Sequence, residues 1–317
     1  MINNNEICLP LWRLAAALGL LLVAGCDPRQ PSVRGPNSEP VDRIEASSLS
    51  LPIVADGSNS GARPLVPNVT DDPDTIGPTP APEQLLQAFR SIATQGLSVR
   101  LVPAVQSGAA IALVVELSLE QFMPVLLAQD GSTDGIAALT TEGATVVLGS
   151  PFVAEFSPLQ PLGLLQLDGR LVSELQPHGY TRVLGLRSDS VGVVGRGEFH
   201  RGLFDAALQV GPGIIENGRL DISTRELKLP AYYRTFLVSC GSQILVGAST
   251  QPLHLRTLGE ALLAFAQSQG LSCDEAVNLS GDREVLLAVR NSREAVIYGN
   301  PRVKKTALIG FLPKPKL

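Results

Sequence analysis

Hydrophobic and polar residues follow two different periods in the second part of the chain. Leu85, Phe89 and Ile92 recur at the spacing of one helix face, and Pro82 suits the first position of a helix. This pattern predicts a helix that begins at Pro82. The runs that follow are short, aliphatic and rich in β-branched residues, which is typical of strands. The predicted strands are 97–105, 109–117, 144–148, 162–167, 171–175, 183–186, 191–194, 206–210, 236–239, 276–279, 285–289, 295–298 and 306–311, with a short helix at 133–141.

A second long helix is predicted over 257–269. Thr257 and Glu260 have the spacing of a capping box, and the apolar residues after them form one stripe at helical spacing. Strands mixed with a few helices favour the α+β class. We therefore expect a single folded domain over 83–317, with a mixed, strand-rich sheet and a few packed helices.

The first residues of the chain have the pattern of an export signal. An apolar run, 14–23, follows Arg13, and it is shorter than the roughly 20 residues that span a bilayer. It ends in Leu22-Val23-Ala24-Gly25-Cys26, which resembles the lipobox of bacterial lipoproteins. The resemblance implies that the signal peptide 1–25 is removed and that Cys26 is lipidated and anchors the protein to a membrane. An ordinary signal peptide with an incidental cysteine is the alternative.

The residues after the signal predict a location and a tether. Asp27 resembles the signal that retains lipoproteins in the inner membrane of Gram-negative bacteria, so we expect the periplasmic face of that membrane. The segment 26–82 holds many of the 24 prolines and no aromatic residue. Such a composition does not bury enough apolar surface to offset the entropy of ordering, which predicts a disordered, Pro-rich tether.

Charge and composition exclude several classes of function. The net charge of -5 and the pI near 5.3 provide no basic field for nucleic acid, so we expect no nucleic-acid partner. The three histidines, at 178, 200 and 254, are far apart and match no zinc motif. We therefore expect no metal and no cofactor. After removal of the signal peptide two cysteines remain, Cys240 and Cys273, and the sequence leaves open whether they form a disulfide or stay as thiols.

Several glycine-marked segments then follow one another along the chain. They are 143–152, 161–171, 207–218, 233–235, 275–282 and 307–311. Their succession resembles the phosphodiester glycosidase family over most of residues 97–312. The resemblance implies a domain that acts on a linkage between a sugar and a phosphate.

Two of these segments depart from the family pattern. The family usually has Asn-Gly-Gly-Phe-Phe where this chain has Leu148-Gly149-Ser150-Pro151-Phe152. It has Leu-Asp-Gly-Gly where this chain has Leu279-Ser280-Gly281-Asp282, so Ser280 stands at the position of the expected carboxylate. Glycoside hydrolysis needs a carboxylate, which a serine does not supply.

The resemblance assigns roles to individual residues of this chain. Asp282 is the candidate catalytic carboxylate, and Arg234 is the candidate phosphate contact, because a guanidinium suits that anion. A strand-end arginine paired with a surface acid is the simpler interpretation of Arg234. The candidate substrate-binding residues are Gly149, Ser150, Gly211, Ser280 and Gly281, although Gly211 also fits a plain tight turn.

Three functions are therefore open at this point. The first is a periplasmic lipoprotein whose domain acts on a sugar-phosphate linkage in envelope material. The second is a catalytically silent relative that binds an envelope glycan or a partner protein through the same cleft. The third is a scaffold lipoprotein without a small ligand.

Overall fold

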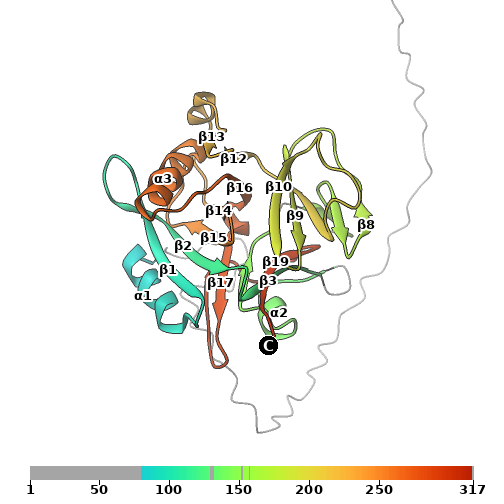
Figure 1. Ribbon diagram of the computed structural model, residues 1–317, viewed down its shortest axis with the longest axis horizontal. Coiled ribbons are helices and arrows are strands. Elements are labelled where there is room, and N and C mark those ends of the chain that lie inside the picture. Colours follow the sequence, from blue (N-terminus) through green and yellow to red (C-terminus); the bar gives the residue numbers. More distant parts are fainter. Residues whose placement is uncertain (1–79, 129–131, 151–152, 157, 316–317) are drawn as a thin grey trace, which may run out of the picture. The chain divides into compact units, whose positions relative to one another are not determined.

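Strands dominate the computed structural model, which describes residues 80–128, 132–150, 153–156 and 158–315 (Figure 1). A seven-stranded sheet forms one side of the fold. Its strands, in spatial order, are β1 (Leu97–Pro103), β2 (Ala110–Ser118), β15 (Gln243–Ser249), β14 (Arg234–Cys240), β16 (Glu275–Gly281), β12 (Gly213–Glu216) and β13 (Arg219–Leu220).

Two five-stranded sheets and one hairpin complete the strand content of the described residues. One sheet has the order β10 (Ser190–Gly195), β9 (Arg182–Arg187), β11 (Ala206–Val210), β7 (Leu165–Leu167) and β8 (Arg170–Ser173). The other has the order β18 (Ala295–Gly299), β17 (Leu286–Arg290), β4 (Val146–Leu148), β19 (Leu308–Pro313) and β3 (Phe122–Leu127). The hairpin is β5 (Val153–Phe156) with β6 (Leu159–Pro161).

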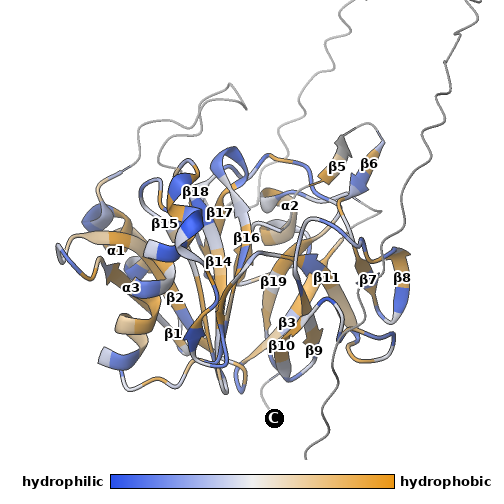
Figure 2. Ribbon diagram, turned by 90° about the horizontal axis from the view of Figure 1, so that it is seen from above, coloured by the Kyte–Doolittle hydropathy of each residue, from blue (hydrophilic) through white to orange (hydrophobic). Residues whose placement is uncertain are grey.

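Both faces of the seven-stranded sheet are buried. Successive side chains of a strand point to opposite faces, so Leu113 and Val115 of β2 enter one hydrophobic cluster and Val114 enters another. Helix α1 (Pro82–Ile92) packs into the first cluster, which also includes strands of the five-stranded sheets. Helix α3 (Leu255–Ser268) packs into the second. Figure 2 shows that apolar residues concentrate in the strands, whereas polar residues are frequent in the connecting loops.

The structure confirms the strand-rich character and corrects the expected sheet. We predicted a mixed sheet, but every strand pair among the described residues is antiparallel. Hydrophobic periodicity reports which face of a strand is buried and does not report its direction, which explains this error. The helix predicted at Pro82 is confirmed, and the short helix expected at 133–141 is α2 (Gly135–Thr140).

Helix α3 begins earlier than its sequence motif predicts. The helix starts at Leu255, so Thr257 lies inside its first turn and does not cap it. The cap comes from Glu226, in the 3-10 helix η1 (Thr224–Lys228). Its carboxylate accepts the backbone N–H groups of Leu255 and Arg256, at 2.8 and 3.2 Å. A distant acid thus replaces the local capping box.

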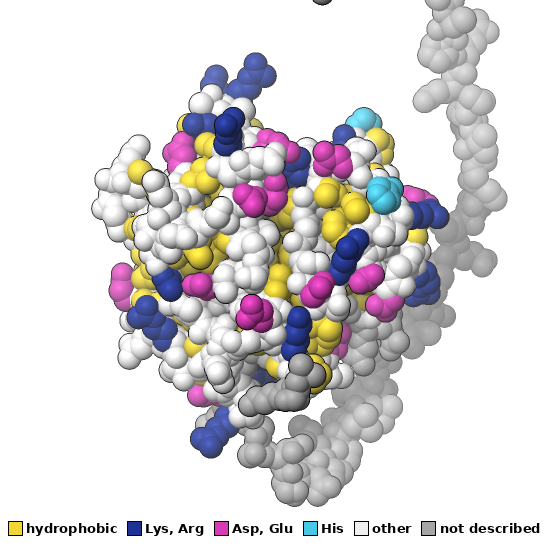
Figure 3. Space-filling model, viewed as in Figure 1, with side chains coloured by type: hydrophobic (Ala, Val, Ile, Leu, Met, Phe, Trp, Pro, Cys, Tyr) yellow, Lys and Arg dark blue, Asp and Glu magenta, His cyan; other side chains and the backbone are white. Residues whose placement is uncertain are grey.

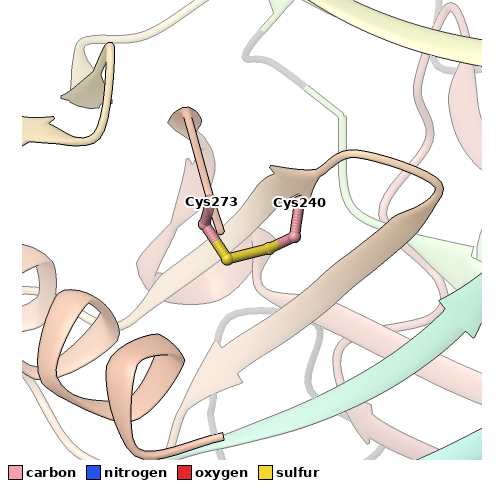
Figure 4. The surroundings of a disulfide bond; sticks show 2 residues. All are labelled: Cys240 and Cys273. Carbon is pink, nitrogen blue, oxygen red and sulfur yellow. A yellow bond between two sulfur atoms is a disulfide. The ribbon is translucent and has the colours of Figure 1, made fainter. Parts of the chain in front are cut away.

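A disulfide connects the last residue of β14 to the segment that precedes β16 (Figure 4). Cys240 and Cys273 are 33 residues apart in the sequence, and both are buried beside α3. The bond therefore ties together two neighbouring strands of the seven-stranded sheet at the end where β14 finishes and β16 begins.

The N-terminal predictions fall on residues that the structure does not describe. The signal peptide 1–25, Cys26, Asp27 and nearly all of the tether 26–82 lie outside the described residues. No helix within the described residues is both long enough and apolar enough to cross a membrane.

Candidate functional site

The predicted site residues, which are far apart in the sequence, gather around the second half of β16. Ser280 and Gly281 belong to that strand, and Asp282 follows it directly. The other predicted residues reach this stretch through a neighbouring strand or a loop.

Arg234 and Asp282 lie at the end of this region. Arg234 begins β14 and pairs with Gly281 of β16. The N–H of Asp282 donates to the carbonyl of Tyr233 at 3.1 Å, and its own carbonyl accepts the N–H of Val285. Asp282 is exposed and has a φ of 49°, which non-glycine residues adopt infrequently. The backbone on both sides therefore holds Asp282 in a left-handed conformation with its carboxylate facing solvent.

Ser280 and Gly149 are in direct contact beneath this end. Ser280 is fully buried, and its hydroxyl donates to the carbonyl of Glu284 at 3.1 Å. A Cβ atom added at Gly149 would lie 2.6 Å from the Ser280 hydroxyl oxygen and 2.8 Å from the Glu284 carbonyl oxygen. Gly149 is therefore required by the close approach of two chain segments. Neither residue presents a polar group to solvent.

Ser150 lines a very small cavity next to Gly149. The cavity has a volume of about 20 Å³ and is bounded by the segment 161–165 between β6 and β7, by β11 and by the segment before β19. A space of about this size holds roughly one water molecule. Ser150, which was predicted to bind substrate, lies on the wall of this space and is buried.

Gly211 is attached to β16 by a set of backbone and amide hydrogen bonds. Its N–H donates to the carbonyl of Asn278, and the side-chain amide of Asn278 donates to the carbonyl of Gly211 at 3.2 Å. The N–H of Asn278 in turn donates to the carbonyl of Pro212, and the Gly211–Pro212 peptide is cis. Gly211 thus lies in a turn that is hydrogen-bonded to β16. This arrangement fits the interpretation of Gly211 as a plain tight turn.

Glu226 and Tyr232, which the sequence did not indicate, contact Arg234, and His254 approaches Glu226. Its guanidinium lies 3.9 Å from a carboxylate oxygen of Glu226 and stacks on the ring of Tyr232, with 5.0 Å from Cζ to the ring centroid. The Nδ1 of His254 lies 4.0 Å from the other oxygen of Glu226. The partner of Arg234 is therefore a largely buried acid, whereas the simpler interpretation expected a surface acid.

Burial sets the electrostatics of this cluster. Burial lowers the pKa of Arg234, and the negative charges of Glu226 and Asp282 oppose that effect. Arginine stays charged throughout the ordinary pH range, so the site keeps a cation. The Nε of Arg234 is buried and makes no hydrogen bond to any described residue. The guanidinium therefore retains donor capacity that its described neighbours do not use.

A buried ion pair between Lys305 and Glu284 adjoins Ser280. Lys305 is 1% exposed, and its ammonium group donates to the carboxylate of Glu284. Burial lowers the pKa of Lys305, and the charge of Glu284 acts against it. The backbone carbonyl of the same Glu284 accepts the hydroxyl proton of Ser280. Ser280 is therefore connected to the buried Lys305–Glu284 pair and has no exposed surface.

Among the described residues, no group of three or more His, Cys, Asp or Glu side chains is placed to hold a metal ion. Glu226, Tyr232 and His254 are the members of the cluster that sequence reasoning missed. Glu226 lies in a segment without a motif, and its partners are contributed by β14 and α3, so no local pattern in the sequence identifies it.

Comparisons with known proteins give a distant likeness of fold. No model of a protein family matches the chain, and no curated protein matches it. Among solved structures, the catalytic domain of zebrafish N-acetylglucosamine-1-phosphodiester alpha-N-acetylglucosaminidase, auto-inhibited by its pro-peptide, is 12% identical, with a TM-score of 0.49. That match covers 76% of this chain and 97% of the zebrafish chain. A hypothetical protein from Synechocystis is 14% identical, with a TM-score of 0.45. That match covers 69% of this chain and 62% of the Synechocystis chain.

Proposed function

We propose that this domain binds a sugar phosphodiester of the cell envelope through Arg234 and does not hydrolyse it. The observation that carries the proposal is the burial of Ser280 and its hydrogen bond to the backbone. Ser280 occupies the position of the expected carboxylate and is fully buried. Its hydroxyl donates a hydrogen bond to a backbone carbonyl. It has no charge with which to stabilise a positive charge at the anomeric carbon.

The supporting observation for binding is the cation at the end of β16. Arg234 is held in place by Glu226 and Tyr232, and the planar guanidinium is suited to bidentate contact with phosphate. A positioned, partly desolvated cation binds an anion more strongly than a mobile surface cation does. We further propose that the domain acts at the envelope, attached through lipidated Cys26 and the Pro-rich tether.

A second candidate function is hydrolysis with Asp282 as the carboxylate. One observation favours it: Asp282 is exposed, lies close enough to Arg234 to influence its pKa, and is held in an infrequent backbone conformation. Backbone strain of this kind concentrates at functional sites. Against it, Asp282 stands two positions after the residue at which the family carries its carboxylate, and small displacements of a catalytic group are costly.

Calorimetric titration of the full chain with methyl N-acetylglucosaminyl phosphodiester tests both candidates. We expect binding without cleavage, and we expect Arg234→Gln to weaken it about tenfold or more, because a charge-assisted hydrogen bond is lost. Arg201→Gln is the control, since Arg201 is an exposed arginine paired with Glu174 in another sheet region. Asp282→Asn should leave the affinity equal or higher. Cleavage of the phosphodiester that disappears in Asp282→Asn would instead establish the hydrolase.

A further inference from the structure

Residues 223–232, which we call the η1 segment, carry three exposed hydrophobic side chains, and two residues of the segment, Glu226 and Tyr232, contact Arg234. Leu227, Leu229 and Tyr232 are 44%, 59% and 37% exposed. Seven large hydrophobic side chains are exposed among the described residues, and these three fall within six positions of one another. Isolated exposed hydrophobic residues are normal, but a cluster marks a surface that contacts something apolar.

The charges of the η1 segment complement an anion. Arg225 and Lys228 are exposed, whereas the acid of the segment, Glu226, turns inward and caps α3. Figure 3 shows Lys and Arg side chains gathered at the end of the molecule where η1 lies, at the top of the view in Figure 1. The outward side of the segment is therefore cationic and apolar, in a chain with a net charge of -5.

Direct contacts join this surface to the candidate site. Glu226 approaches the Arg234 guanidinium at 3.9 Å, and the ring of Tyr232 stacks on the same group. Tyr232 is still 37% exposed, so it lies between Arg234 and solvent-facing parts of the segment. Tyr232 therefore connects the candidate phosphate contact, Arg234, to the segment that carries Leu227 and Leu229.

We infer that the ligand is a sugar phosphodiester with an apolar aglycone, that is, a lipid-linked saccharide. This inference rests on the proposed function. Arg234 contacts the phosphate, and the η1 segment covers the first methylene groups of the lipid chain. Each buried methylene contributes favourable free energy, and the flanking Arg225 and Lys228 add attraction for the phosphate. A soluble ligand with a small aglycone would leave Leu227 and Leu229 in water.

Two probes that differ only in the aglycone test the inference. The full chain carrying Cys26→Ser, used so that neither acyl chains nor detergent compete, is titrated with methyl and with dodecyl N-acetylglucosaminyl phosphodiester. We expect the dodecyl probe to bind at least about tenfold more tightly, because several methylenes leave water. The double variant Leu227→Ser, Leu229→Ser should lose that advantage and keep the affinity for the methyl probe.

Matched controls come from exposed hydrophobic residues elsewhere. Val105 and Val172 are 62% and 47% exposed, and their serine variants should behave like the parent chain. Equal affinity of both probes for the parent chain would overturn the inference and leave the proposed function standing. Equal loss in the control variants would also overturn it, since it would show non-specific partitioning. Failure of both probes to bind would overturn the proposed function together with the inference.

A vesicle experiment separates a lipid-linked ligand from a membrane surface. The parent chain and the double variant are sedimented with vesicles of phosphatidylglycerol and of phosphatidylcholine. We expect no difference between the two proteins. Vesicle binding that is lost in the double variant, together with an unchanged preference of that variant for the dodecyl probe, would assign the η1 segment to the membrane surface and overturn the inference.

Discussion

Removal of the Glu226 carboxylate should loosen the N-terminus of α3 and the support of Arg234 at the same time. The carboxylate is 11% exposed and accepts two backbone N–H groups, from Leu255 and Arg256. Loss of a helix cap costs about 1 kcal/mol, and loss of a negative charge at a helix N-terminus costs about 0.3–1 kcal/mol. Removal of a partner from partly buried Arg234 adds to both. We therefore expect Glu226→Ala to lower the free energy of unfolding by about 2–3 kcal/mol.

Urea unfolding followed by far-UV circular dichroism measures this change. Glu226→Gln should cost about 1 kcal/mol, since the amide oxygen still accepts an N–H but no longer provides a charge. The control is Glu260→Gln, which removes an exposed ion pair with Arg256 within α3. That variant should change the free energy of unfolding by less than about 0.5 kcal/mol. If Glu226→Ala and Glu260→Gln cost the same, Glu226 does not cap the helix as described.

Two further predictions concern the framework of the site. Replacement of Cys240 and Cys273 by serine should lower the free energy of unfolding by about 3–4 kcal/mol, because a loop of 33 residues is no longer closed in the unfolded chain; an unchanged urea midpoint would contradict this. Lys305→Met should cost about 3 kcal/mol by leaving Glu284 buried without its cation, and adding Glu284→Gln should restore part of the loss. Burial lowers the pKa of Lys305 from about 10.5. Between the lowered pKa and pH 10.5, the folded state therefore binds fewer protons than the unfolded state. The free energy of unfolding of the parent chain should therefore rise as pH rises from the lowered pKa toward 10.5. The variant with both Lys305→Met and Glu284→Gln should not show this rise.

The sequence predicts most of the strands because their burial alternates or is continuous. β2 and β16 were found in this way. The strands that were not predicted are β3, β5, β6, β12, β13 and β15. In β3, Pro124 interrupts the apolar run, and proline normally argues against a strand. The structure places β3 at the edge of its sheet, where a proline is tolerated. The antiparallel direction of the strands was not predictable from periodicity, since the period of burial is the same in both directions.

The sequence located the site only through glycines at which two segments of the chain pack closely together. Gly149 and Gly281 were noticed as parts of family-like segments, and the structure shows tight backbone packing at each of them. The roles of Glu226 and Lys305 were not visible, because their partners are distant in the sequence. Glu226 caps a helix that begins 29 residues later, and such a contact exists only once the chain has folded.

Phosphorus NMR of methyl N-acetylglucosaminyl phosphodiester mixed with the full chain tests the central claim most directly. One spectrum reports binding through the position and width of the phosphorus signal, and a series over time reports cleavage. We predict a broadened or shifted signal with the parent chain, an unperturbed signal with Arg234→Gln, and an intact phosphodiester throughout. A new phosphomonoester signal that grows with time, or a perturbation that persists in Arg234→Gln, would contradict the account.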